Sequence, residues 1–410
     1  MNLFLQKSKV NQKSVIAVSG SKSETNRLLL LQALYPNIEL TNVSNSDDSE
    51  VMTKALLSDN SVKDIHHAGT AMRFLTAYFS TQEVKEVVLT GSSRMKERPI
   101  SILVDALRQL GVAIDYTENE GFPPLKITGK KIIQKKVSLP ANVSSQYISA
   151  LLLVAPKLEN GLELTLEGEI TSIPYIKMTL ALLNEIGVET SFVGNVISVA
   201  PKPIMINNQV LTVESDWSSA SYWYSIVALS ETGTVVELSS YKQNSLQGDS
   251  ALATIYKDFG VETVFKDNNA VVISKTATHN TQRITHNLNN SPDIAQTIAV
   301  TCFGLGMGCH LTGLHTLKIK ETDRLEALKA ELEKFGASVT ITDETLTLEP
   351  ATAIIDNVVV KTYQDHRMAM AFAPLALKIN LIINEAEVVS KSYPDFWKDL
   401  QQIGFVMSEV

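Results

Sequence analysis

Cysteine, long apolar runs and excess positive charge are scarce in this sequence, and each shortage excludes a class of protein. The only cysteines among 410 residues are Cys302 and Cys309, which can form neither a disulfide framework nor a CxxC metal pair, so we expect buried, inert thiols. No apolar run approaches the roughly 18 residues of a membrane-spanning helix, which argues against a membrane role. The first 20 residues resemble neither a secretory signal nor a transit peptide, so we expect a cytoplasmic protein.

Charge, composition and length set further limits. The formal net charge is -8, whereas non-specific nucleic-acid binding needs a broad basic surface, so we expect no nucleic-acid partner. Any anionic ligand must instead meet cations that are concentrated locally. The composition is 44% hydrophobic and 20% charged, as in ordinary globular proteins. A chain of this length predicts two domains of roughly 200 residues each.

One pattern recurs along the chain: an amphipathic segment ends in a glycine and leads into two short strand-like runs. The glycines are spaced 68 to 76 residues apart, at Gly111, Gly187, Gly260, Gly336 and, in a truncated copy, Gly404. Each glycine stands where a helix end needs a left-handed residue, and the alternation of Val, Ile and Thr after it predicts a hairpin. The chain has room for about six such repeats, since one repeat takes about 70 residues, longer than a solenoid period. We therefore predict two domains of three repeats, each with helices covered by sheet.

Small and basic residues gather at the predicted starts of three helices in the first half. They lie in the segments 20–27, 66–73 and 143–147, and a basic cluster at 94–98 follows a predicted strand. Open backbone N–H groups at a helix start bind anions, and serine hydroxyls suit phosphate. Ordinary alternatives stay open: Arg27 can be a surface residue, Ser144 a plain N-cap, and the 94–98 cluster a solvated face.

The adjacent His66 and His67 raise the question of a metal site. Neighbouring residues on a helix point in different directions, and no third ligand lies nearby in the sequence. We therefore expect no metal.

The second half has cations and carboxylates beside chain breaks, at 291–293, 320–324, 365–367 and 391–395. On a helix, Lys320 and Arg324 would lie on one face, where two like charges repel unless a shared anion offsets them. Glu321 and Asp323 can instead neutralise them as an ordinary surface network.

Seven motifs together resemble those of 5-enolpyruvylshikimate-3-phosphate synthases, in that family's order and over nearly the whole chain. They are GSKSETNR, AGTAMR, GSSRMKERPI, VSSQY, KETDRL, DHRMAM and SKSYPDF. The resemblance implies the two-domain α/β enolpyruvyl transferase fold, an inside-out α/β barrel in which each domain holds three βαβαββ units with helices covered by sheet. It implies one domain from 1–19 plus 216–410, an inserted domain of 20–215, and an active site in the cleft between them.

The resemblance also implies an activity. Family members transfer the enolpyruvyl (carboxyvinyl) group of phosphoenolpyruvate to the 5-hydroxyl of shikimate 3-phosphate and release phosphate. This step belongs to the shikimate pathway, which makes chorismate and the aromatic amino acids and is the target of glyphosate. We expect these two substrates as the only partners, no cofactor, and a monomer.

By the same resemblance, individual positions receive roles. Shikimate 3-phosphate would be held by Lys22, Ser23, Arg27, Ser144, Ser145, Gln146, Ser172, Asp293, Thr316 and Lys320. Phosphoenolpyruvate would be held by Lys22, His67, Gly69, Arg94, Gln146, Arg324, Arg367 and Lys391. The catalytic residues would be Asp293, as base for the 5-hydroxyl, with Lys22 and Glu321 moving protons at the enolpyruvyl carbons. Bidentate pairing with phosphate and carboxylate explains the many arginines.

The chain departs from the usual family pattern at three positions. His67 and Thr316 stand where asparagine is usual, and Phe74 where proline is usual. A histidine can still donate a hydrogen bond, but it is larger and titrates near neutral pH.

Two alternatives are set against this interpretation. The sister family that acts on UDP-N-acetylglucosamine uses a cysteine in a mobile loop, whereas the corresponding segment here is Arg94 to Arg98 and both cysteines lie far downstream. A non-catalytic binding protein on the same scaffold would be expected to have lost some of the proton-transfer residues, and none is missing here.

Overall fold

The chain forms two compact units, each with its own hydrophobic core. The computed structural model describes residues 1–410 except 142–143, 171–172, 205–206, 268, 278–281 and 321. Unit 1 consists of Met1–Ser19 and Glu214–Val410, and unit 2 of Gly20–Val213. The sequence-based boundary after residue 215 lies two residues beyond this division. Buried apolar side chains form one cluster in each unit.

The repeating element of both units is a βαβαββ repeat. One copy in unit 2 runs β4 (Val62–Asp64), α3 (Gly69–Ser80), β5 (Glu86–Thr90), α4 (Ser101–Gln109), β6 (Ala113–Tyr116) and β7 (Leu125–Thr128). Its sheet has the order β4-β5-β7-β6, with β4 parallel to β5 and the other pairs antiparallel. The parallel pair is joined through α3, as a crossover connection requires, and the hairpin follows α4.

The second copy in unit 2 has the same order, β8-β9-β11-β10. It is built from β8 (Lys136–Pro140), α5 (Ser145–Val154), β9 (Leu162–Glu167), α6 (Ile173–Glu185), β10 (Thr190–Val193) and β11 (Val196–Val199).

The third copy in unit 2 is shorter. It contains α1 (Lys22–Leu34), β3 (Ile38–Thr41), α2 (Asp47–Leu57) and, from the end of the unit, β12 (Gln209–Thr212). β12 pairs in parallel with β3 in a two-stranded sheet. Within the described residues this repeat has no hairpin.

Unit 1 contains three four-stranded sheets of the same kind in its described part, with orders β14-β15-β13-β2, β16-β17-β19-β18 and β20-β21-β1-β22. The first repeat comprises β2 (Lys13–Ile16), α7 (Trp217–Leu229), β13 (Val235–Leu238), η3 (Gly248–Ala251), α8 (Leu252–Ile255), η4 (Tyr256–Phe259), β14 (Val261–Phe265) and β15 (Val271–Lys275). The second comprises β16 (Arg283–Asn287), η5 (Pro292–Ile294), α9 (Ala295–Gly304), β17 (Gly308–Thr312), η6 (His315–Ile319), α10 (Arg324–Lys334), β18 (Val339–Ile341) and β19 (Leu346–Leu348). The third comprises β20 (Val358–Val360), α11 (His366–Phe372), β21 (Leu381–Ile383), η8 (Ala386–Lys391), α12 (Phe396–Gln402) and β22 (Val406–Glu409), completed by β1 (Leu3–Gln6).

The repeat predicted from the glycines is confirmed. Gly111, Gly187, Gly260, Gly336 and Gly404 all have positive φ, between 72° and 113°. A hairpin follows each of the first four, and β22 follows Gly404 and pairs with β1. A residue with a Cβ is disfavoured in this conformation, which explains the glycine at each helix end.

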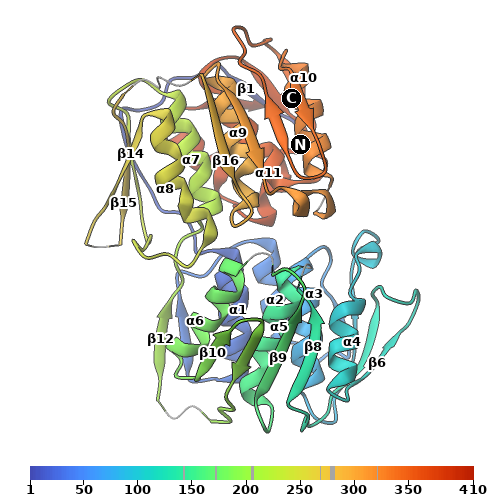
Figure 1. The fold of residues 1–410 in the computed structure, drawn as a ribbon. Coiled ribbons are helices and arrows are strands. Elements are labelled where there is room, and N and C mark those ends of the chain that lie inside the picture. Colours follow the sequence, from blue (N-terminus) through green and yellow to red (C-terminus); the bar gives the residue numbers. More distant parts are fainter. Residues whose placement is uncertain (142–143, 171–172, 205–206, 268, 278–281, 321) are drawn as a thin grey trace. The chain divides into compact units, whose positions relative to one another are not determined.

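The first helix of each repeat lies at the centre of its unit. In unit 1 these helices are α7, α9 and α11, and all their residues are buried except Ser218. In unit 2 they are α1, α3 and α5, which pack against one another. A helix that is apolar on all sides must be covered on all sides, and the sheets do so, as β14 and β15 do beside α7 and α8 in Figure 1. The predicted fold, with helices covered by sheet, is confirmed.

Two further findings bear on the exclusions made from the sequence. Cys302 in α9 and Cys309 in β17 are both free and buried, as predicted, and burial raises the pKa of the Cys302 thiol well above its usual value. In the described part of the chain, every helix is too short or too polar to cross a membrane.

Candidate active site

Several of the predicted site residues lie at the N-terminal ends of the inner helices. In unit 2 these ends are Lys22 of α1, Gly69 of α3 and Ser145 of α5. In unit 1 Arg367 lies in the first turn of α11, and Asp293 lies in η5, directly before α9. Backbone N–H groups at helix N-termini carry partial positive charge, so the repeat places several anion-attracting ends in each unit.

Asp293 is the centre of a cationic cluster in unit 1. Its Oδ1 lies 2.9 Å from Arg324 Nη1 and 3.5 Å from Lys320 Nζ, and its Oδ2 lies 3.3 Å from Arg367 Nη2. Three cations thus surround one carboxylate that is itself only 13% exposed. The two oxygens of this carboxylate can accept hydrogen bonds from the surrounding cations or from a ligand.

The structure corrects the expectation that Lys320 and Arg324 share a helix face. α10 begins only at Arg324, because Asp323 caps it by accepting hydrogen bonds from the N–H groups of Leu325 and Glu326. Lys320 precedes this cap. The two cations nevertheless share an anion, which is the carboxylate of Asp293.

Arg324 also binds a second carboxylate in unit 1. Its Nε donates to Asp365 Oδ2 over 2.6 Å. Asp365 in turn caps α11 through a hydrogen bond from the Arg367 N–H to its Oδ1, at 2.9 Å. This arrangement fixes the guanidinium of Arg324 and the start of α11 relative to each other.

Lys391 lies near the same end of α11. Its Nζ donates to the carbonyl of Gln364 over 2.7 Å. Tyr363 and Gln364 both have positive φ, 53° and 56°, a conformation that is unfavourable for residues with side chains. The strained pair turns the chain so that this carbonyl meets Lys391 directly before Asp365.

Thr316 lies in η6 of unit 1. Its Oγ1 is buried and has no hydrogen-bond partner in the described part of the chain. A buried hydroxyl usually has such a partner, so Thr316 is an exception among the described residues.

In unit 2, Lys22 begins α1, and its Nζ lies 3.5 Å from Asp48 Oδ2. Both side chains are mostly buried, at 19% and 10% exposed. The side chain of Ser21 caps the same helix by accepting from the Glu24 N–H.

Arg27 is not the surface residue that one interpretation of the sequence allowed. It is only 2% exposed, and it donates to Thr179 Oγ1, Ser149 Oγ and the carbonyl of Ser23 over 2.8, 3.0 and 2.7 Å. Burial lowers the pKa of Arg27 to about 10. These three bonds use three of its five N–H groups.

The ends of α3 and α5 are linked to each other. Gln146 Nε2 donates to Thr70 Oγ1 over 3.0 Å, and Ser144 caps α5 by accepting from the Gln146 N–H. The cap at Ser144 was one of the two roles considered from the sequence. At α3 the residue before the helix is Ala68, which has no side chain that could cap it, so the first N–H groups of α3 remain available to an anion.

Arg98 is a residue that the sequence analysis did not single out. Its guanidinium lies over Gly69, since a Cβ built at Gly69 would be 2.4 Å from Arg98 Nη1. The positive charge of Arg98 adds to burial in lowering the pKa of Arg73 to about 10. Two cations therefore adjoin the open end of α3. The motif GSSRMKERPI contained Arg98, but the spacing alone did not distinguish it from Arg94.

Arg94 is exposed and pairs with Glu97 over 2.9 Å at the short helix η1 (Met95–Glu97). The contact is between residues three apart on the surface, where ion pairs contribute little. The side chain can therefore exchange Glu97 for a ligand at small cost.

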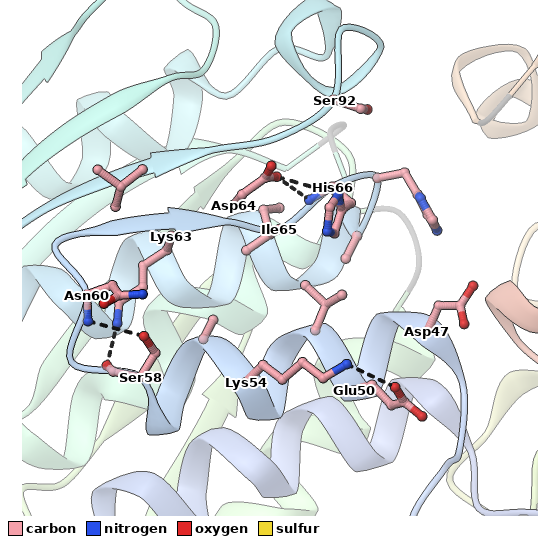
Figure 2. Close-up of a pocket in the computed structure, with 15 residues that line it drawn as sticks. Asp47, Glu50, Lys54, Ser58, Asn60, Lys63, Asp64, Ile65, His66 and Ser92 are labelled. Atoms are coloured by element: carbon pink, nitrogen blue, oxygen red, sulfur yellow. Dashed lines mark hydrogen bonds and ion pairs between the residues drawn. The ribbon is translucent and has the colours of Figure 1, made fainter.

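A cavity of about 650 Å³ in unit 2 lies beside the residues that precede α3. Figure 2 shows Lys54 bonded to Glu50, and the Lys63 ammonium bonded to the carbonyl of Ser58. Both lysines that line the cavity, Lys54 and Lys63, are thus already bonded to protein groups. His67 and Ala68, which directly precede Gly69, also line it.

Two predicted residues, Ser172 and Glu321, lie outside the described residues. The described parts of the chain contain no group of three His, Cys, Asp or Glu side chains that could hold a metal ion. The structure thus brings together Asp293, Lys320, Arg324 and Arg367 in unit 1, and Gly69 and Gln146, with Arg98, in unit 2.

Comparison with known proteins gives consistent matches. Residues 54–400 match the family model of EPSP synthase (3-phosphoshikimate 1-carboxyvinyltransferase). The chain is 46% identical over 398 residues to a 3-phosphoshikimate 1-carboxyvinyltransferase of Bacteroides fragilis (strain YCH46), with 96% of each chain covered. It is 34% identical over 419 residues to the protein of the same name from Shewanella pealeana, with 95% of this chain and 96% of that one covered.

Solved structures give the same fold. An EPSP synthase from Acinetobacter baumannii has a TM-score of 0.82 at 21% identity, with all of both chains covered. The enolpyruvyl transferase NikO from Streptomyces tendae has a TM-score of 0.74 at 13% identity, covering 100% of this chain and 98% of that one.

Proposed function

Because the chain belongs to the EPSP synthase family, we propose that it transfers the enolpyruvyl group of phosphoenolpyruvate to the 5-hydroxyl of shikimate 3-phosphate. Phosphate is released, and the product continues along the shikimate pathway to chorismate and the aromatic amino acids.

The observation that carries this proposal is the position of Asp293. Its carboxylate lies within 3.5 Å of Lys320, Arg324 and Arg367. A base that removes a proton from a substrate hydroxyl must lie where that substrate binds, and substrates that are polyanions bind among cations. The cations around Asp293 support its assignment as the base for the 5-hydroxyl.

Phosphoenolpyruvate is assigned, from the family resemblance, chiefly to arginine and lysine side chains. Its carboxylate and phosphate match the planar donors of arginine, which bind such groups through two parallel hydrogen bonds. The N-terminal end of α3, with no capping side chain at Ala68, offers backbone N–H groups to the same anion. The assigned residues are Lys22, His67, Gly69, Arg94, Gln146, Arg324, Arg367 and Lys391, and Arg98 is added from its position over Gly69.

Shikimate 3-phosphate is assigned to hydroxyls and cations near the helix starts. The hydroxyls of Ser144 and Ser145 stand at the start of α5, and the buried Oγ1 of Thr316 lacks a partner among the described residues. The assigned residues are Lys22, Ser23, Arg27, Ser144, Ser145, Gln146, Ser172, Asp293, Thr316 and Lys320.

The chemistry needs one proton to be added, at C3, and two to be removed, one from the 5-hydroxyl and one from the methyl group that forms. Protonation of the enol carbon C3 makes C2 electrophilic, and the 5-hydroxyl loses its proton to Asp293 as it attacks. When phosphate leaves, the methyl group gives a proton back, so the group that first protonated C3 can also serve as the base. Lys22 and Glu321 are assigned to these transfers. Lys22 lies 3.5 Å from Asp48, which holds its ammonium in place. The proposed steps use side chains alone and no cofactor or metal.

The enzyme is proposed to act as a monomer in the cytoplasm. Both substrates are charged phosphate esters that do not cross membranes freely, so an enzyme that uses them must share their compartment. No nucleic acid or membrane takes part in the proposed reaction.

A phosphate-release assay with two acceptors tests the proposal. Phosphoenolpyruvate with shikimate 3-phosphate should release phosphate, and phosphoenolpyruvate with UDP-N-acetylglucosamine should not. The buried thiols of Cys302 and Cys309 cannot supply the reactive loop cysteine of the sister family. Release with UDP-N-acetylglucosamine alone would overturn the proposal, and binding of both substrates without release would identify a binding protein.

A further inference from the structure

A second carboxylate reaches Arg367 through a single hydroxyl. Arg367 Nη2 donates to Ser218 Oγ over 3.2 Å, and Ser218 donates to Asp249 Oδ2. A serine hydroxyl has one donor and two acceptor positions, so it can make both contacts at once. Asp249, in η3, is only 5% exposed. The chain of contacts therefore runs from a buried carboxylate to an arginine of the proposed phosphoenolpyruvate site.

Asp249 is poorly satisfied as an anion. Its Oδ1 is buried and has no hydrogen-bond partner in the described part of the chain. A fully ionised carboxylate in the interior normally has several donors or a direct cation. Here Arg367 reaches Asp249 only through Ser218, and it lies 3.3 Å from the competing carboxylate of Asp293.

The charged groups around Asp249 come from three elements. The start of α7 brings Asp216, η5 brings Asp293, and α11 brings Arg367. Tyr222 of α7 is fully buried near Arg367. Burial raises the pKa of its hydroxyl above the usual value, so Tyr222 carries no charge near neutral pH. α8, which packs on η3, has the sequence LATI and brings no titratable group. Asp249 thus shares one nearby arginine with two other carboxylates.

This environment holds Asp249 close to the midpoint of its titration. The pKa of Asp249 is raised to about 7, first by burial and then by the charge of Asp293, while Arg367 and the Ser218 hydrogen bond act in the opposite direction. Any additional negative charge at Arg367 acts in the same direction as Asp293.

We propose that Asp249 is a positioning residue that acts as an exchangeable counter-charge for Arg367. It neutralises Arg367 through Ser218 in the free protein. It takes up one proton from solvent when the carboxylate or phosphate of a substrate binds this arginine. The anion thus replaces the charge of Asp249, and Arg367 is held in one orientation in both states. This inference rests on the proposed function, because it places an anion of phosphoenolpyruvate at Arg367.

Proton uptake on binding tests the inference directly. Calorimetric titration of the full chain with phosphoenolpyruvate, in the presence of shikimate 3-phosphate, is repeated at pH 7.5 in buffers of different ionisation enthalpy. A carboxyl with pKa about 7 is about three quarters ionised at that pH. The wild type should therefore take up as much as about 0.7 proton per ligand more than Asp249→Asn. The ligand's own phosphate titrates equally with both proteins and cancels in this difference.

Two further variants keep the test decisive. In Ser218→Ala the pKa of Asp249 rises because a hydrogen bond to its charged form is lost, so Asp249 is already protonated and uptake should also fall. Asp343→Asn removes an exposed carboxylate that pairs with Lys318 and should take up as many protons as wild type.

The outcomes separate the inference from the proposed function. If the wild type binds phosphoenolpyruvate but Asp249→Asn and Ser218→Ala take up as many protons as it does, the role of Asp249 is wrong and the function stands. If the wild type does not bind phosphoenolpyruvate with shikimate 3-phosphate, the proposed function itself is wrong. A loss of affinity in Asp249→Asn without a change in proton uptake would indicate a purely structural role and would also overturn the inference.

Discussion

Arg324 and Asp365 form an ion pair in the interior of unit 1, with 2.6 Å between Arg324 Nε and Asp365 Oδ2 and side chains that are 2% and 0% exposed. Asp365 is fully buried and depends on this arginine for charge compensation, whereas Arg324 also pairs with Asp293 over 2.9 Å. The pair therefore holds the start of α10 against the start of α11, and it fixes Arg324 beside Asp293.

Arg324→Met should lower the free energy of unfolding of unit 1 by about 3–5 kcal/mol, because it leaves Asp365 buried without its cation. Urea unfolding followed by tryptophan fluorescence would measure this, since Trp217 and Trp223 lie in the core of unit 1. The matched control is Lys9→Ala, which breaks an exposed pair with Glu231 and should leave the midpoint unchanged. A midpoint for Arg324→Met equal to that of the control would show that the buried pair is not required.

Asp293→Asn should lower turnover by about 10²–10⁴-fold, the usual contribution of a general base. Affinity for phosphoenolpyruvate should not fall, because three cations lose the carboxylate they share. Steady-state kinetics and calorimetric binding would measure the two effects separately. Asp258→Asn, which removes an exposed partner of His286, is the control. Turnover close to wild type in Asp293→Asn would show that another group removes the proton.

Gly69→Ala should weaken phosphoenolpyruvate binding by displacing Arg98, because the added Cβ would lie 2.4 Å from Arg98 Nη1. A displacement of this size at a bound group can cost up to about a hundredfold. In an Arg98→Ala background the same change should cost much less, so the two effects should not add in a double-mutant cycle. Strictly additive effects on the Michaelis constant would mean that Arg98 does not mediate the effect.

Asp249 also makes stability depend on pH. Burial raises its pKa to about 7, above the value of about 3.9 in an unfolded chain. Between these values the folded state binds more protons than the unfolded state, so this group lowers stability as the pH rises from about 4 to 7. The stability of Asp249→Asn relative to wild type should therefore increase from pH 4.5 to pH 7. Chemical unfolding at several pH values would measure it, and a constant difference would contradict the raised pKa.

The repeat and its inner helices were predictable from sequence because their signals are local. A glycine at a helix end followed by alternating β-branched residues can be recognised within a short stretch of sequence. Five glycines fit this pattern: Gly111, Gly187, Gly260, Gly336 and Gly404. The short repeat of α1, β3 and α2 gave no such signal. Only four residues separate Leu57 from Val62, which leaves no room for a hairpin.

The contacts within the candidate site were not predictable in the same way, because they join distant residues. Arg27 is buried through Ser149 and Thr179, which lie 122 and 152 positions away. Asp249 contacts Arg367 only through Ser218, which lies 31 positions before Asp249 in the sequence. Asp249 itself lies in an ordinary polar stretch. Lys320 and Arg324 seemed to be helical neighbours because nothing in the spacing revealed that Asp323 would begin α10 between them.

β1 and β2 each pair with strands from much later in the chain, which has a consequence for folding during synthesis. Both strands are synthesised before unit 2, yet β2 pairs with Val235–Leu238, and β1 lies between β21 and β22, whose last residue is Glu409. Unit 2 holds all the strands of its own sheets within Gly20–Val213 and can complete them during synthesis. At about 5–20 residues per second, β1 therefore waits about 20 to 80 s for its partners. Leu3 and Leu5, which the finished sheet buries, remain open to other nascent chains or to chaperones throughout that interval.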